Sequence, residues 1–258
     1  EYFATIVRPK ELDPKIKIHY ITVEEEAQLS FKGIVPQMYR LTANQLDVGS
    51  GNTKGGYLNA NRSFVPVTFP IGTKSFQRLV EARTGASSAI ADYQKAAEKL
   101  LIDSLGRLVV YQFREKADFK SRDVVYLSGG IVWAIASLMH PDQIRQNHVE
   151  LSRQDIAEFR RLVYSNYQEL INPDLRSKMN EEDAAASLAN IKRVVGTYDQ
   201  KALLAGSMWL DELVQQLNSS NPNKKLIFPR YAYVGWISGY IIDKISKQYT
   251  DMAVSRDY

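Results

Sequence analysis

The chain has 258 residues, of which 45% are hydrophobic and 24% charged, and this balance excludes an intrinsically disordered protein because it can build a core. The absence of cysteine excludes disulfides and thiolate metal sites and agrees with the reducing cytoplasm that we expect as the location. The net charge of +4 is mildly basic with dispersed Lys and Arg, and no run approaches the roughly 18 apolar residues of a membrane span, so we expect neither a nucleic acid nor a membrane as partner.

The first half of the chain predicts strands and hairpins separated by helices. Residues 16–23 alternate apolar and polar side chains, which predicts a strand, and the run 24–32 predicts a helix that stops at Gly33. A further strand leads into the loop after residue 47. Residues 55–72 then predict a hairpin. Helical spacing follows in two segments, 74–83 and 87–105.

The second half is mostly helical. A β-rich segment at 123–130 precedes a short helix at 131–138. Ser152 with Asp155 three residues later forms a start resembling a capping box. We expect more helices at 182–195, 199–217 and 233–246, and a short strand at 226–229. The pattern predicts an α/β protein with a mixed sheet, in one domain with a peripheral helical part at about 150–258.

Two glycine-containing turns follow predicted strands. In DVGSGNTK, a carboxylate at a strand end is suited to Mg²⁺, and the small residues after it let backbone amides approach a phosphate. In YLSGGIVW, the glycines lie at the start of a helix, where free amides favour an anion. Plain turns are the alternative interpretation of both segments. At Gly72 and Thr73 we favour a simple bend, and for the acidic run 24–26 a solvated helix start.

Four segments in order resemble the second half of the exopolyphosphatase/guanosine pentaphosphatase family: HYITVEEEAQLSFKGI, LDVGSGNTKGGYL, VTFPIGTKSF and YLSGGIVWAIASL. The usual family pattern is SGxEEAxL, DIGGGSTE, FPLG and GTGGT, and the resemblance extends from about residue 16 to residue 138. It implies a ribonuclease H-like (actin-like ATPase) lobe with a five-stranded type of mixed sheet flanked by helices and a helical C-terminal half.

The resemblance also implies roles for particular residues. Glu26 matches the general base that activates the attacking water, and Asp47 matches the acid that binds Mg²⁺. The implied phosphate-binding residues are Gly49, Ser50, Gly51, Asn52, Thr53, Lys54, Ser128, Gly129 and Gly130.

The phosphate loop departs from the family pattern at three positions. Ser50 replaces a glycine, Asn52 replaces a serine, and Lys54 replaces an acid. Ser50 adds a Cβ where the backbone approaches the phosphate. Lys54 either neutralises polyphosphate or marks the loss of the family's metal arrangement.

The first phosphate loop of the family, of the DxGSNS type, has no counterpart at residues 1–15. We therefore expect residues 1–15 to be the remnant of a preceding lobe and residues 16–258 to be the second lobe. The expected partners are then the missing N-terminal lobe of the same protein and either polyphosphate or guanosine pentaphosphate. A homodimer is a further alternative.

Three functions are compatible with these features. The resemblance favours a Mg²⁺-dependent phosphoanhydride hydrolase that removes the terminal phosphate of inorganic polyphosphate or guanosine pentaphosphate. The first alternative is a non-catalytic relative that binds a phosphorylated ligand or other proteins through the altered loop. The second alternative is an actin-like filament protein, because DVGSGNTK also resembles the first phosphate loop of plasmid-segregating actins.

Overall fold

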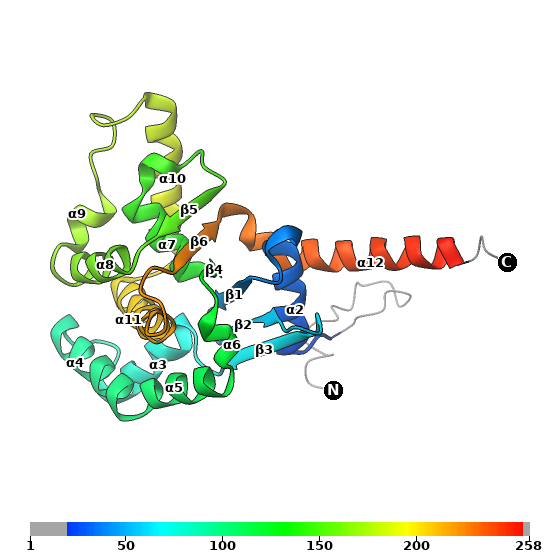
Figure 1. Ribbon diagram of the computed structural model, residues 1–258. Helices are drawn as coiled ribbons and strands as arrows, with labels where there is room; N and C mark the ends of the chain where they lie inside the picture. The colour runs from blue at the N-terminus through cyan, green and yellow to red at the C-terminus, as the bar shows by residue number, and fades with distance from the viewer. Residues whose placement is uncertain (1–19, 255–258) are drawn as a thin grey trace, which may run out of the picture.

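A six-stranded mixed sheet lies at the centre of residues 20–254, the part of the chain that this computed structural model describes (Figure 1). The strand order is β3-β2-β1-β4-β6-β5. Strand β4 is parallel to β1 and β6, whereas the pairs β1–β2, β2–β3 and β5–β6 are antiparallel. The strands are β1 (Ala43–Val48), β2 (Thr53–Leu58), β3 (Phe64–Phe69), β4 (Val124–Ser128), β5 (His148–Leu151) and β6 (Lys225–Pro229).

The α/β class and the mixed sheet flanked by helices are confirmed, but the expectation of a five-stranded sheet is wrong. The sheet has a sixth strand because β5 pairs with β6 at one edge, where Val149 lies opposite Phe228. Because the sheet has this sixth strand, the ribonuclease H-like description of the fold is not exact. The sequence analysis missed β5, although its residues alternate between exposed and buried side chains as half-buried strands do.

The helices fill the connections between these strands and most of the second half of the chain. Those of the first half are α2 (Val23–Ile34), α3 (Thr73–Thr84), α4 (Ile90–Leu100), a π-helical turn (Leu101–Leu105), α5 (Gly106–Glu115) and α6 (Ala117–Ser121). Those of the second half are α7 (Gly130–Met139), α8 (Arg153–Ser165), α9 (Tyr167–Ile171), α10 (Glu181–Thr197), α11 (Gln200–Asn218) and α12 (Gly235–Val254). Short 3₁₀ turns lie at Gln37–Tyr39, Pro141–Gln143 and Arg230–Val234.

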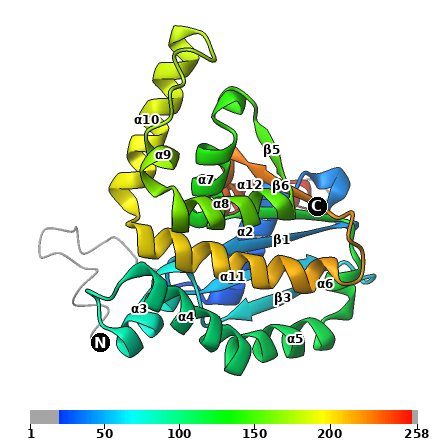
Figure 2. The same ribbon diagram turned by 90° about the vertical axis from the view of Figure 1, so that its left-hand side faces the viewer.

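Helices cover both faces of the sheet. On one face α11 lies over the sheet and runs roughly along the strands, with α3, α4 and α5 beside it, as Figure 2 shows. The larger hydrophobic cluster fills this layer. On the opposite face α2 packs on β1, β2 and β3, over a smaller cluster that includes Phe31 and Tyr126. Trp209 of α11 is fully buried in the larger cluster and donates a hydrogen bond from its indole N–H to Thr53 of β2, at 2.8 Å. Helices therefore cover one face of the sheet and the β1–β3 part of the other, and β1 and β4 end at an edge beside α2.

Helix α2 differs from its prediction at both ends. Residues 16–19 of the predicted strand lie outside the described residues, and residues 20–22 are not a strand. Thr22 instead caps α2 in a capping box with Glu25. Gly33 does not end the helix, because its missing side chain is needed for packing: a Cβ there would lie 1.9 Å from the carbonyl oxygen of Gly235 in α12.

The predicted helices of the second half are confirmed. Ser152 caps α8 in a capping box with Asp155, and Asp199 caps α11. Helix α12 extends further than predicted and projects from the body of the molecule (Figure 1). Within residues 20–254, no helix combines the length and apolar character needed to cross a bilayer. The predicted remnant at residues 1–15 lies outside the described residues.

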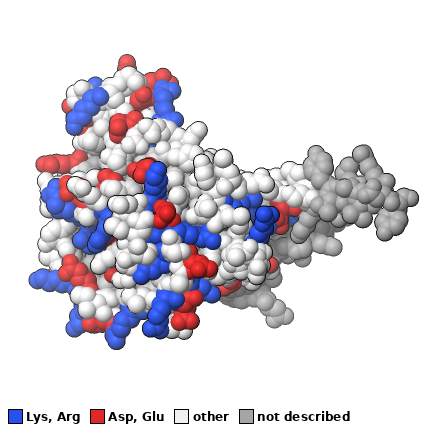
Figure 3. Space-filling model, viewed as in Figure 1, with Lys and Arg blue, Asp and Glu red and all other residues white. Residues whose placement is uncertain are grey.

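The surface shown in Figure 3 carries Lys, Arg, Asp and Glu side chains interspersed with one another. On that face no large area of one charge is visible, in agreement with the dispersed charges of the sequence.

Candidate functional site

Two adjacent parallel strands place the first two site residues side by side. Asp47 of β1 lies opposite Ser128 of β4, because the two strands are paired in parallel and end at the same edge of the sheet. The Ser128 hydroxyl donates to Oδ1 of Asp47 at 3.0 Å and accepts from the side-chain amide of Gln45 at 3.1 Å. The carboxylate of Asp47 is thus held in a fixed orientation at the sheet edge.

Glu26 reaches the same place from a different element. Helix α2 crosses the face of the sheet toward which Asp47 points, and Glu26 lies in its first turn. The ammonium of Lys54 lies 3.1 Å from Oε1 of Glu26 and 3.1 Å from Oδ2 of Asp47. The structure therefore brings the two predicted acids together around a third residue of the predicted loop.

The turn after β4 depends on two glycines. Gly129 has φ +104°, and a Cβ there would lie 2.1 Å from the carbonyl oxygen of Val48. Gly130 begins α7, and a Cβ there would lie 1.7 Å from the hydroxyl of Tyr198. At Gly129 the positive φ and the contact with backbone require glycine, whereas a side chain at Gly130 would have to displace the ring of Tyr198.

The backbone carbonyls of the loop after β1 accept hydrogen bonds from the start of α3, which the sequence did not indicate. The carbonyl oxygen of Gly49 accepts from the amide of Thr73, and that of Ser50 accepts from the amides of Lys74 and Ser75. The loop carbonyls therefore cap the amino end of α3, and the segment at Gly72 and Thr73 that we expected to be a simple bend is the start of this helix.

The other loop residues have separate environments. The Gly51 carbonyl accepts a hydrogen bond from the Ser75 hydroxyl at 2.9 Å. Thr53 is fully buried, and its hydroxyl donates to the carbonyl of Ile71. Asn52 contacts Lys54 at 3.3 Å. The hydroxyl of Thr53 is therefore part of the core and is not exposed to a ligand.

A cavity of about 720 Å³ opens at this edge of the sheet. Of the predicted site residues, its walls include Glu26, Asp47, Ser128, Gly129 and Gly130, whereas the loop residues 49–54 do not line it.

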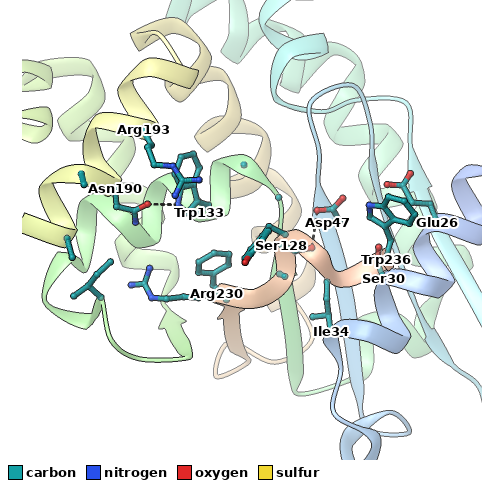
Figure 4. Close-up of a pocket in the computed structure, with 18 residues that line it drawn as sticks. Glu26, Ser30, Ile34, Asp47, Ser128, Trp133, Asn190, Arg193, Arg230 and Trp236 are labelled. Atoms are coloured by element: carbon teal, nitrogen blue, oxygen red, sulfur yellow. Dashed lines mark hydrogen bonds between the residues drawn. The ribbon is translucent and has the colours of Figure 1, made fainter. Parts of the chain in front are cut away.

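The far end of the cavity carries residues that the sequence analysis did not identify. Figure 4 shows Arg193, Asn190 and Trp133 at the end opposite Glu26, with Arg230 between them and Asp47. The Trp133 indole donates to Asn190 at 3.1 Å, and the guanidinium of Arg193 lies 5.7 Å from the Trp133 ring. These residues come from α7, α10 and the segment after β6, and no local motif connects such distant positions. Only the fold could reveal them.

Burial and charge set the protonation of the groups around the site. Burial alone would lower the pKa of Lys54, but the charges of Asp47 and Glu26 outweigh it and raise the pKa above its ordinary value of 10.5. Burial and the nearby charge of Asp47 raise the pKa of Tyr198. Burial lowers the pKa of Arg230 from its ordinary value. Lys54 is therefore a cation at neutral pH, and the cavity combines two carboxylates with two guanidinium groups.

The arrangement does not fit a divalent metal ion between Glu26 and Asp47. Mg²⁺ binds oxygen ligands at about 2.1 Å in an octahedron. The place between the two carboxylates already holds the ammonium of Lys54. Within residues 20–254, no group of three or more His, Asp or Glu side chains could hold a metal. The metal role of Asp47 stays a prediction that this geometry does not favour.

Comparisons with known proteins identify the fold. No protein-family model matches the sequence, and no curated protein matches it. The crystal structure of the Ppx/GppA family member of Aquifex aeolicus aligns with 88% of this chain and 64% of its own, with a TM-score of 0.51 and 15% identity. An exopolyphosphatase-like protein aligns with 88% of this chain and 68% of its own, with a TM-score of 0.53 and 14% identity. The chain shares their fold. It spans about two thirds of the length of these proteins, and at this identity the likeness is one of fold alone.

Proposed function

We propose that the cavity binds the terminal phosphate of inorganic polyphosphate or guanosine pentaphosphate and that the protein hydrolyses its phosphoanhydride bond. The observation that supports this function is the convergence of Glu26, Asp47 and the Gly129–Gly130 turn on one cavity. Proteins of the same fold include an exopolyphosphatase-like protein, which is compatible with a hydrolase.

In the proposed reaction, water attacks the terminal phosphorus in line with the bridging oxygen. Its oxygen forms the new P–O bond while the P–O bond to the bridging oxygen breaks, and the shortened chain leaves with that oxygen as a phosphate. Glu26 accepts the proton of the water. Lys54 contacts Oε1 of Glu26, so we assign the water to Oε2. The amides at the start of α7 and the guanidinium groups of Arg193 and Arg230 balance the phosphate charges.

Phosphate release from polyphosphate and from guanosine pentaphosphate tests this function. The longest natural form of the protein should be used, because the chain spans only part of the length of the proteins that share its fold. We expect Glu26→Gln to lower kcat by about 100-fold or more, since a general base contributes roughly that much, with little change in binding. Glu24→Gln is the matched control, because Glu24 lies in the same first turn of α2 but does not line the cavity.

A Glu26→Gln protein that releases phosphate at the unsubstituted rate would contradict the role of Glu26. Absence of release from every polyphosphate tested, in the presence and absence of Mg²⁺, would contradict the hydrolase.

One observation favours a second function, which is binding of a phosphorylated ligand without turnover. Lys54 contacts both Glu26 and Asp47, so neither acid is available to a metal in the present arrangement. Calorimetric titration with polyphosphate separates the two functions, because a binding protein would give heat with the ligand but no released phosphate.

A further inference from the structure

The position of Lys54 follows from the pairing of two strands. Lys54 lies directly opposite Asp47 in the antiparallel pair β1–β2 and opposite Thr68 in the pair β2–β3. Side chains of directly opposed residues point to the same face of a sheet. Because β2 is paired on both sides, the backbone of Lys54 is fixed and its side chain must share the face of Asp47.

Helix α2 encloses that face. It packs on β1, β2 and β3 and brings Glu26 to 3.1 Å from the Lys54 ammonium. The side chain of Lys54 is only 7% exposed and is absent from the cavity wall, whereas those of Asp47 and Glu26 are 19% and 33% exposed. The ammonium therefore lies behind the two carboxylates rather than on the surface that meets a ligand.

All three N–H donors of the ammonium have partners within the protein. They are accounted for by Glu26 and Asp47, each at 3.1 Å, and by Oδ1 of Asn52 at 3.3 Å. A phosphate could bind Lys54 only by displacing one of these partners. Asn52 and Lys54 are two of the three positions at which the loop departs from the family pattern, and a hydrogen bond joins their side chains.

We infer that Lys54 is a built-in cation that takes the place of a divalent metal between Glu26 and Asp47, so that phosphate binding in this cavity does not require a divalent ion. The inference rests on the proposed phosphate site for its ligand. The ammonium neutralises and orients the two carboxylates, which is what a shared metal ion would do. It cannot coordinate the phosphate as a metal does, and that contact is left to the α7 amides, Arg193 and Arg230.

Mn²⁺ alone is the probe for this inference, measured by calorimetry and by the shift in Tm. Removing the ammonium with Lys54→Met leaves two carboxylates facing one vacated position, and Lys54→Glu adds a third. We expect both variants to bind Mn²⁺ at least about 10-fold more tightly than the unsubstituted protein, since a nearby positive charge opposes cation binding. Adding Asp47→Asn to either variant should abolish the gain. Lys74→Met is the matched control, because it also removes a lysine charge near the loop but not from the two acids.

The unsubstituted protein provides a test that does not depend on the folding of a variant. One Mn²⁺ bound to it and lost on Asp47→Asn would overturn the inference, and so would EDTA abolishing the binding of polyphosphate. If polyphosphate does not bind at all, the proposed function fails, whereas the Mn²⁺ comparison still decides the role of Lys54.

Discussion

At the scale of single residues, the site contains an ion-pair cluster in which one lysine contacts two acids. Asp47 is hydrogen-bonded by Ser128 and paired with Lys54, and Lys54 is paired again with Glu26. The three charges cannot be exchanged independently, because both acids share Lys54 and its removal leaves each of them without this cation. We therefore expect substitutions in this cluster to be strongly non-additive.

Lys54 should also stabilise the fold. Lys54→Met leaves Asp47 and Glu26 close together with no cation between them, and we expect it to lower the free energy of unfolding by about 2 kcal/mol, less than for a fully buried pair because both acids are partly exposed. Denaturant unfolding at neutral pH measures the loss.

The contribution of Lys54 should depend on pH in the alkaline range. Its pKa in the folded protein is raised above the ordinary 10.5, so the folded state holds this proton more tightly than the unfolded chain does. The stabilisation is complete below 10.5 and is lost as the pH rises through the higher folded-state value. The difference in unfolding free energy between the unsubstituted protein and Lys54→Met should thus shrink above pH 10.5. A difference that grows there would contradict the assigned ion pairs.

At the scale of elements, the close crossing of α2 and α12 depends on the absence of side chains. Gly239 of α12 lies against α2, where a Cβ would be 1.9 Å from the carbonyl oxygen of Leu29. One turn further along, a Cβ at Gly33 of α2 would likewise clash with the carbonyl oxygen of Gly235 in α12. These glycines let α12 pack closely on α2, the helix that carries Glu26 to the cavity.

Gly239→Ala should therefore destabilise the protein by about 2 kcal/mol or more, because backbone must move to admit the methyl group. The control is Gly196→Ala in α10, where a Cβ meets nothing within 4 Å. We expect that change to stabilise the helix by roughly 0.5–1 kcal/mol, since alanine is the better helix former. Thermal unfolding of both variants measures the contrast, and equal effects would refute the close packing of α2 on α12.

At the scale of the whole molecule, α11 joins the two halves of the chain. Trp209 packs its ring against Phe69 and Phe76 of the first half, with ring centroids 5.7 and 6.5 Å away, and hydrogen-bonds to Thr53. The strand that carries Lys54 begins at Thr53. The core beneath the site is thus built by a helix more than a hundred residues away in sequence.

Trp209→Ala should lower the free energy of unfolding by about 3–5 kcal/mol, as large-to-small changes of buried aromatic residues do. Tyr233→Ala is the control for loss of an aromatic residue, because Tyr233 is 83% exposed, and we expect its effect to stay within about 0.5 kcal/mol. Chemical denaturation at a single pH measures the change in unfolding free energy for both variants. A Trp209→Ala loss as small as that of Tyr233→Ala would mean that α11 does not anchor the core.

The sequence alone determined the type and approximate limits of most elements, because these depend on local signals. The strand that contains Asp47, the Ser152 cap and the glycine turn at Gly129–Gly130 are each recognisable within a few residues. The edge strand β5 was missed because four alternating residues are a weak signal. The limits of α2 were wrong because the packing of Gly33 on α12 outweighs the usual tendency of glycine to end a helix.

Only the tertiary structure decided where the predicted site residues lie and what they contact. The sequence left open whether Lys54 neutralises polyphosphate or marks the loss of the family's metal arrangement. The contacts of its ammonium with Glu26 and Asp47 depend on the register of β1 with β2 and on the placement of α2 over them. The same holds for Thr53, whose hydroxyl supports the core, and for Arg193 and Arg230, which reach the cavity from distant elements. Local structure follows from neighbouring residues, whereas the direction and the partner of a side chain are set by strands and helices that are remote in the chain.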